Sequence, residues 1–203
     1  MSRQLRLSGG MRLQSPNGLQ TRPTTGRVRE AVMNLLSHRL QGCHWLDLCS
    51  GSGVMGCEAL RRGARWVVAV EREQKTAQIC AANLKATSKG LSHSHEIRIL
   101  NKEILTLLRG GRQARRASAQ RASGRKSAEV IDSNFDLIYL DPPYDSNLYE
   151  PALIALIQGD WLREDAFVIC ELDKSVSFSP PDPWQEMDHR IYGNTSIMIF
   201  TPQ

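Results

Sequence analysis

Residues 45–56 read Trp-Leu-Asp-Leu-Cys-Ser-Gly-Ser-Gly-Val-Met-Gly, which is the pattern of a buried strand, a glycine-rich turn and the start of a helix. Gly51, Gly53 and Gly56 satisfy the G-x-G-x-x-G pattern, and such glycines allow the backbone to approach a ligand closely. The N-terminus of the following helix offers free N–H groups to that ligand. The stretch therefore predicts an α/β fold with a nucleoside cofactor at the turn. On its own it fits a nicotinamide enzyme as well as a methyltransferase.

Two carboxylates beside the turn indicate which cofactor it holds. Asp47 lies in the strand before the turn, where it can meet a cationic group of S-adenosylmethionine directly or through water. The same carboxylate would repel the pyrophosphate of a dinucleotide, although a helix or loop cap is an alternative role for it. Glu71 ends the next strand, eighteen residues after Gly53, and can accept both hydroxyls of a ribose. Glu71 suits either class of enzyme, so the preference for the methyl donor rests on Asp47.

The second informative stretch is Asp141-Pro142-Pro143-Tyr144, which directly follows the apolar run 135–140. Open α/β sheets bind ligands here, beyond the carboxyl ends of their strands. An aryl amine is a poor nucleophile, and the Asp141 carboxylate and the Pro142 carbonyl can accept its N–H groups. The prolines restrict φ and hold these acceptors in place, while the Tyr144 ring can stack on a base. Together the two turns predict methyl transfer to the exocyclic amino group of a base.

Elsewhere the apolar residues alternate between the strand period and the helix period. The pattern predicts strands at 45–49, 66–70, 97–100, 137–140, 167–172, 189–192 and 196–200. It predicts helices at 54–62, 74–86, 103–108 and 148–158, the first of them ending at Gly63. Strands that alternate with helices imply a parallel, doubly wound sheet. The Gly193-Asn194 link is too short for a parallel crossover, so one strand must run antiparallel.

The N-terminal part precedes this alternation. Residues 5–21 are expected to form a short β-hairpin, with its turn at Ser15-Pro16-Asn17-Gly18. Residues 26–40 show helical spacing of apolar residues, and Thr24 or Thr25 is the expected N-cap. We therefore expect an extension over residues 1–40 and a second unit over residues 41–203.

The charge of the 203-residue chain is unevenly placed. Residues 1–29 hold six arginines and residues 109–126 hold seven basic residues, and neither segment holds an acid. The remaining residues contain all 21 acids against 13 bases, so a mildly acidic body carries two basic attachments. Segregated arginine is typical of polyanion binding, although a solubilising tail is an alternative. Residues 110–129 lack apolar periodicity and are expected to be a disordered basic insertion.

Several classes of protein are disfavoured by the composition. An apolar run of about 18 residues, as a membrane span requires, does not occur, and the N-terminus lacks the apolar core of a signal peptide. The five cysteines form no CxxC pair, so we expect neither disulfides nor a metal site. We expect a cytosolic monomer.

With both turns placed, the chain resembles the bacterial 16S rRNA guanine-N2 methyltransferases, the RsmD-like family, from about Leu7 to Phe200. The markers are the segment 19–30, read as Leu-Gln-Thr-Arg-Pro-Thr-Thr-Gly-Arg-Val-Arg-Glu, the turn 46–53, Glu71 and the Asp-Pro-Pro-Tyr turn. The resemblance implies a Rossmann-like class I methyltransferase fold with a seven-stranded, mostly parallel sheet. It implies that S-adenosylmethionine is the donor and that the acceptor is a guanine amino group of small-subunit rRNA, free or in a pre-assembled subunit.

The resemblance also implies roles for individual residues. The donor would be held by Asp47, Ser50, Gly51, Ser52, Gly53, Glu71 and Glu103. The family usually has Asp or Asn at the position of Glu103, so the longer side chain departs from its pattern. The N-terminal hairpin and helix would face RNA through Arg12, Arg22, Arg27 and Arg29. The basic insertion is not typical of the family.

Four alternatives share part of the pattern. An adenine-N6 DNA methyltransferase would use both turns but normally needs a target-recognition domain, for which the chain has little room. A protein-glutamine methyltransferase usually has Asn in place of Asp141. A nicotinamide dehydrogenase would give the Asp-Pro-Pro-Tyr turn no role. A non-catalytic RNA-binding module would bind RNA equally well after Asp141→Ala.

Overall fold

A computed structural model describes residues 5–16, 25–111, 134–143 and 146–203. The strands are β1 His44–Leu48, β2 Trp66–Val70, β3 Glu96–Leu100, β4 Phe135–Leu140, β5 Leu162–Asp173, β6 Trp184–Tyr192 and β7 Thr195–Pro202. The helices are α1 Gly26–Leu35, α2 Ser37–Leu40, α3 Val54–Arg61, α4 Gln74–Ser88 and α6 Tyr149–Gln158, and residues 104–111 are helical as well. The basic insertion lies almost entirely outside the described residues.

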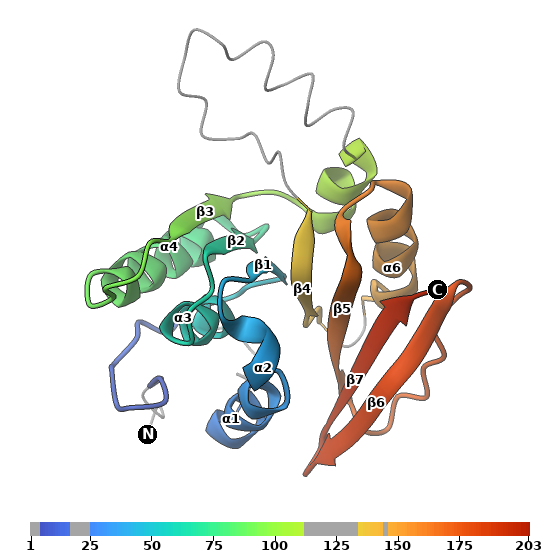
Figure 1. Cartoon of the computed structure of the whole chain (residues 1–203), viewed down its shortest axis with the longest axis horizontal. Helices are drawn as coiled ribbons and strands as arrows, with labels where there is room; N and C mark the ends of the chain where they lie inside the picture. Colours follow the sequence, from blue (N-terminus) through green and yellow to red (C-terminus); the bar gives the residue numbers. More distant parts are fainter. Residues whose placement is uncertain (1–4, 17–24, 112–133, 144–145) are drawn as a thin grey trace, which may run out of the picture.

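The strands form one seven-stranded sheet in the order β3-β2-β1-β4-β5-β7-β6 (Figure 1). Neighbouring strands from β3 to β5 are parallel, whereas β7 runs antiparallel to both β5 and β6. The predicted doubly wound sheet and its one antiparallel strand are therefore confirmed. The chain order reverses between β1 and β4, which makes the cleft beyond their carboxyl ends the topological switch point.

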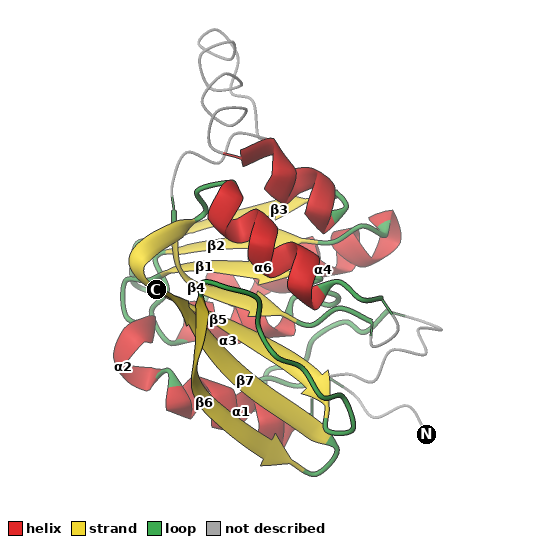
Figure 2. Cartoon of the chain, turned by 90° about the vertical axis from the view of Figure 1, so that its right-hand side faces the viewer, coloured by secondary structure: helices red, strands yellow, loops and turns green. Residues whose placement is uncertain are grey.

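Helices cover both faces of the sheet, which explains why β1 and β2 are buried along almost their whole length. On one face α1, α3 and α4 pack against strand residues such as Trp45 and Tyr139. On the other face α6 and the helical residues 104 and 108 pack against Leu46 and Ile138. Figure 2 shows α6 in front of the sheet and α1 and α3 behind it. In the described part of the chain, every helix is too short or too polar to cross a membrane.

The sequence pattern located the central elements well and the edge strands less well. Strand β5 begins five residues before the predicted start, at Leu162, because the exposed residues 163–165 interrupt the apolar pattern. Strand β6 also begins five residues early, at Trp184, since as an edge strand it exposes most of its side chains. Thr25 is the N-cap of α1 and accepts a hydrogen bond from Val28, and Gly63 has the positive φ of 95° expected after α3.

Two predictions about the N-terminal part were wrong. The chain reverses at Ser8-Gly9-Gly10, inside the stretch expected to be the first strand of the hairpin, and an isolated antiparallel bridge joins Arg6 to Arg12. The expected turn at 15–18 extends beyond the described residues. Gly9 and Gly10, with φ of 95° and 90°, provide the turn conformation that other residues rarely adopt. The single helix expected over 26–40 is divided at Leu36, so that Leu36 and Leu40 both become buried. Residues 17–24 lie outside the described part.

The N-terminal segments are fastened to the body by a buried carboxylate. Glu58 of α3 is fully buried and accepts hydrogen bonds from the backbone N–H of Ser8, at 2.8 Å, and from its hydroxyl, at 3.0 Å. It also forms ion pairs with Arg62 and, at 3.9 Å, with Arg29 of α1. A buried charge is tolerated only when it is paired and hydrogen-bonded, so these groups depend on one another.

We therefore expect Glu58→Gln to lower the free energy of unfolding by about 3 kcal/mol, because it removes the negative charge that pairs with the buried Arg29 and with Arg62. Urea denaturation would measure the change. Asp188→Asn is the matched control, since its ion pair with Arg190 is largely exposed and its loss should change stability by at most about 1 kcal/mol. Equal effects of the two substitutions would contradict the central role of Glu58.

Candidate active site

The glycine turn after β1 is held open by its backbone conformation. Cys49, Gly51 and Gly53 have positive φ values of 61°, 52° and 75°. The Gly53 N–H donates to the Ser50 carbonyl at 2.7 Å, and a Cβ at Gly53 would lie only 2.6 Å from the Cys80 sulfur. In contrast, a Cβ at Gly51 would meet no atom within 4 Å. Gly53 is thus required for packing, whereas the space above Gly51 is open to a ligand.

Glu71 connects this turn to the end of β2. One carboxylate oxygen accepts the Gly51 N–H at 3.0 Å and the other accepts the Glu73 N–H at 2.9 Å. Asn101 holds the same corner from the end of β3, because its side-chain amide donates to the carbonyls of Glu71 and Arg72, both at 2.9 Å. The sequence analysis missed Asn101. Its position directly after a strand was the signal that could have identified it.

Asp47 lies behind the turn and is almost fully buried. It accepts the Gly56 N–H of α3 at 3.1 Å, so the capping role considered as an alternative is present in the structure. Burial raises the pKa of this carboxyl to about 7, and the charge of Glu71 contributes in the same direction. A nearby cation would favour the ionised form, which is the electrostatic property that a cationic ligand would use.

Glu103 acts as the N-cap of the helical stretch 104–111. One of its carboxylate oxygens accepts the Leu105 N–H at 2.9 Å and the other accepts the Thr106 N–H at 2.7 Å. The side chain is exposed at the end of β3. A ligand contact with this carboxylate would have to share it with the helix.

The two predicted turns meet at the switch point. Leu48 of β1 pairs with Leu140 of β4 in parallel register, so Cys49 and Asp141 follow at the same level of the sheet. Burial raises the pKa of the Cys49 thiol to about 12, so the thiol stays protonated at neutral pH. Three carboxylates contribute to this shift through their charges, those of Glu71, Asp141 and Asp47. Of the acids predicted for the donor and the acceptor, the structure thus gathers Asp47, Glu71 and Asp141 around one point.

The proline corner after β4 is only partly described. Pro142 is buried and Pro143 is exposed, and the Pro143 carbonyl accepts the Ser146 N–H at 3.0 Å. Tyr144 lies outside the described residues.

The arginines predicted to contact RNA lie in different environments. Arg12 and Arg27 are exposed, and Arg22 lies outside the described residues. Arg29 is 6% exposed, and its guanidinium donates to the Arg6 carbonyl and pairs with Glu58. Its assignment as a surface contact for RNA is therefore corrected, because its charge is used inside the fold.

Asn83 of α4 is a further polar residue that the sequence analysis did not identify. Its side-chain amide donates to the carbonyls of Gln14 and Ser52, each at 2.9 Å, and its oxygen accepts the Gln14 N–H at 2.8 Å. This buried side chain therefore joins the N-terminal segment directly to the glycine turn.

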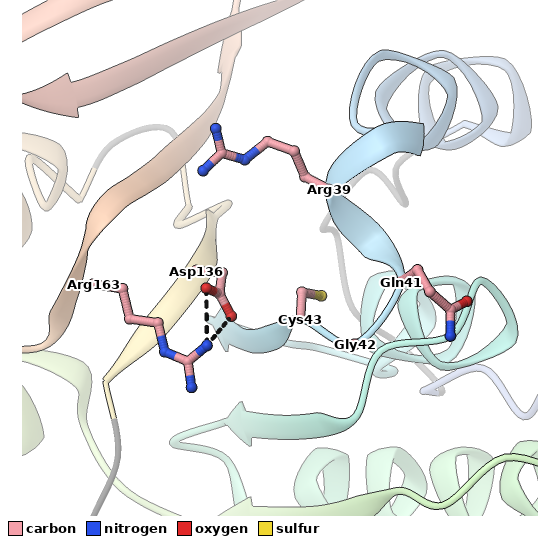
Figure 3. A pocket seen from close by; sticks show the side chains of 6 residues that line it. All are labelled: Arg39, Gln41, Gly42, Cys43, Asp136 and Arg163. Atoms are coloured by element: carbon pink, nitrogen blue, oxygen red, sulfur yellow. Dashed lines mark hydrogen bonds and ion pairs between the residues drawn. The ribbon is translucent and has the colours of Figure 1, made fainter.

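A cavity of about 310 Å³ lies at the other end of the strands, where β1, β4 and β5 begin (Figure 3). Arg163 spans part of it and pairs with Asp136 at 3.0 Å. Because both predicted turns lie beyond the carboxyl ends of the strands, this cavity is separate from the candidate site. Among the described residues, no group of His, Cys, Asp and Glu side chains is arranged to hold a metal ion.

Comparisons with known proteins agree with this geometry. The model of the family described as Conserved hypothetical protein 95 matches residues 7–201. A Bacillus subtilis protein named "Putative rRNA methyltransferase YlbH" is 30% identical over 94% of this chain and 93% of its own. The "Ribosomal RNA small subunit methyltransferase D" of Haemophilus influenzae is 27% identical over 94% of this chain and 88% of its own.

The fold is shared with solved structures as well. The Escherichia coli structure "Putative methyltransferase yhhF" superimposes with a TM-score of 0.76 and 24% identity over 98% of both chains. The sheet is therefore a Rossmann-like class I methyltransferase fold. From the family match and from its relatives, the chain belongs to the Conserved hypothetical protein 95 family, which is the RsmD-like family of rRNA methyltransferases.

Proposed function

We propose that this protein uses S-adenosylmethionine to methylate the exocyclic N2 amino group of a guanine in small-subunit rRNA. The observation that supports this most directly is the pairing of β1 with β4, which sets the glycine turn and Asp141 side by side at the switch point. A donor over the turn and a base at the proline corner would then be adjacent. The relatives named for small-subunit rRNA support the choice of acceptor.

The described residues fit the donor. The space next to Gly51 is open, as an approaching nucleoside requires, and both carboxylate oxygens of Glu71 are held beside the turn by hydrogen bonds from the Gly51 and Glu73 N–H groups. A carboxylate oxygen has further lone pairs, so Glu71 can accept the ribose hydroxyls while it keeps its backbone donors. Ser50, Ser52 and Gly53 shape the turn, and Asp47 supplies negative charge from behind it. Glu103 is a weaker candidate, because a contact with the adenine amino group must coexist with its capping bonds.

The donor supplies an electrophilic methyl group, and the protein's part is to position the acceptor nitrogen. The N2 lone pair forms the new N–C bond as the C–S bond breaks, and the electrons of that bond return to sulfur. We assign the Asp141 carboxylate and the Pro142 carbonyl to the two N–H groups of the amine, where they stabilise the positive charge that develops on nitrogen. The proton then leaves to water or to Asp141. Tyr144 would stack on the extruded base.

The substrate can be identified by mass mapping of nucleosides from cells with and without the gene. We expect one N2-methylguanosine to disappear from the small-subunit rRNA of the deletion strain. If rRNA is unchanged while N6-methyladenine disappears from DNA, the adenine-N6 alternative replaces this proposal.

Removal of the amine acceptor should separate binding from chemistry. We expect Asp141→Ala to lower methyl transfer by at least about 100-fold, because a group that stabilises the transition state is lost. Donor affinity, measured by calorimetry, should remain within about threefold because the glycine turn is intact. Turnover at the wild-type rate in a radiolabelled assay would contradict the role of Asp141.

The raised pKa of Asp47 predicts a pH dependence of donor binding. The cationic donor favours ionised Asp47, so binding should release a proton, and affinity should rise by up to about tenfold from pH 6 to pH 8 as the carboxyl titrates near pH 7. Calorimetry across this range measures the effect. Asp47→Asn is the control, since the donor's own amino group titrates in both proteins and only the wild type should show the additional slope. Identical slopes would contradict the role of Asp47.

The exposed N-terminal arginines predict salt-dependent binding of rRNA. Each phosphate contact contributes a slope of roughly 0.7–0.9 in the logarithm of affinity against the logarithm of salt concentration. The double substitution Arg12→Ala and Arg27→Ala should therefore reduce the slope by about 1.5. Arg65→Ala is the matched control, because this exposed arginine lies at the amino end of β2, whereas the two predicted turns follow the carboxyl ends of the strands. A slope that changes equally in both variants would contradict an N-terminal RNA surface.

A further inference from the structure

A second carboxylate lies beside Asp141 and has no place in the chemistry described so far. Glu171 is in the part of β5 that precedes its carboxyl end and is 3% exposed. Strands β4 and β5 are neighbours in the sheet (Figure 1). Leu140 of β4 pairs with Cys170 of β5 in parallel register, so Asp141, directly after β4, and Glu171 of β5 are the next residues along the two chains. Paired strands lie about 4.8 Å apart, and residues in register point to the same face of the sheet.

Glu171 is fixed from the interior of the protein. Its carboxylate accepts a hydrogen bond from the hydroxyl of Tyr139, which is in the neighbouring strand β4. Its backbone carbonyl accepts a hydrogen bond from the hydroxyl of Tyr149 at 2.6 Å. The Tyr139 ring is in turn stacked on Trp45 of β1, with 5.9 Å between the ring centroids. The carboxylate is therefore attached to a rigid part of the sheet.

Glu171 also interacts electrostatically with residues around the candidate acceptor site. Burial raises the pKa of Tyr139 far above its usual value, and the charges of Glu171 and Asp141 both contribute. Both carboxylates therefore lie within electrostatic reach of one hydroxyl. The charge of Glu171 also acts on Arg29 of α1, whose pKa it raises against the larger lowering by burial. A carboxylate in this place is unfavourable for folding compared with an apolar side chain of similar volume, so stability alone does not explain it.

We infer that Glu171 is a specificity-determining residue that accepts the N1–H of the target guanine while Asp141 holds the N2 amine. This inference rests on the proposed function. On the Watson–Crick edge of guanine, the N1–H donor is next to the N2 amine, whereas N1 of adenine is an acceptor. Two fixed carboxylates on neighbouring strands match two adjacent donor groups and would repel the lone pair of adenine N1. A carboxylate has about four acceptor sites, so the Tyr139 bond is compatible with a base contact.

The experiment uses the full chain and two rRNA substrates that differ at the mapped target. One carries guanine and the other carries 2-aminopurine, which keeps the N2 amine but has a lone pair in place of N1–H. We expect the wild type to prefer guanine by at least about 100-fold in kcat/KM, because a site built to accept an N–H rejects an analogue that lacks it. Glu171→Gln should reduce this preference to within about tenfold, since its amide can donate to the N1 lone pair.

The comparison separates a contact with the base from a merely structural role. A structural role of Glu171 would lower turnover of both substrates equally and leave the preference unchanged, which would overturn the inference. Binding of S-adenosylhomocysteine is measured in parallel to show that the variant is folded. If Glu171→Gln does not fold, Tyr139→Phe is used, because it removes the anchor of Glu171 but keeps the ring. The same loss of preference is expected, and an unchanged preference overturns the inference.

The failure of this inference is distinguishable from failure of the proposed function. If the wild type transfers no methyl group to guanine N2, the proposed function is wrong. If it methylates guanine and 2-aminopurine equally well, the proposed function stands and Glu171 does not read N1.

Discussion

The parallel pairing of β1 with β4 is the constraint on which the rest of the site depends. These strands are about ninety residues apart in the chain, yet Leu48 and Leu140 are register partners. Backbone hydrogen bonds fix that register, and the burial of both strands on two faces prevents it from slipping, because a shift by one residue would reverse every side chain. The glycine turn and the proline corner are therefore placed by the sheet itself. Each loop needs only its local geometry, such as the positive φ of Gly53, to complete the site.

The carboxyl edge of the sheet collects negative charge in a protein whose net charge is +5. Asp47, Glu71, Asp141 and Glu171 end or approach the ends of four strands, and burial makes the ionised form of Asp47 unfavourable. Such an edge is suited to a cationic donor and to the N–H groups of a base, but it would repel RNA phosphates. The basic residues lie elsewhere in the sequence, and exposed ones such as Arg12 and Arg27 can bind the phosphates. In the proposed function, separation of the two charges would allow one small protein to bind a polyanion and still present acids to a single base.

The sequence predicted the sheet and both turns because their signals are local. A strand buried on two faces is a short apolar run, and a turn that requires positive φ needs glycine. The errors arose where distant residues decide the outcome. Gly9-Gly10 and Asn17-Gly18 are both good turn sequences. The turn at Gly9-Gly10 is held by hydrogen bonds from the preceding Ser8 to Glu58, which is fifty residues away in the chain. Arg29 resembled a surface residue because its partner lies in another helix. Glu171 lies within a predicted apolar strand, and the sequence alone showed no partner for it there, because its register with Asp141 appears only in the folded sheet.

The N-terminal segments are more than an attachment to the catalytic body. Leu5, Leu7 and Leu13 share one apolar core with Leu60 of α3 and Ile199 of β7, so these segments complete the layer that covers the sheet. The Asn83 side chain binds both Gln14 and Ser52, and Gln14 is only two residues along the chain from the exposed Arg12. The segment that carries the exposed Arg12 and the turn expected to hold the donor are therefore parts of one packed unit.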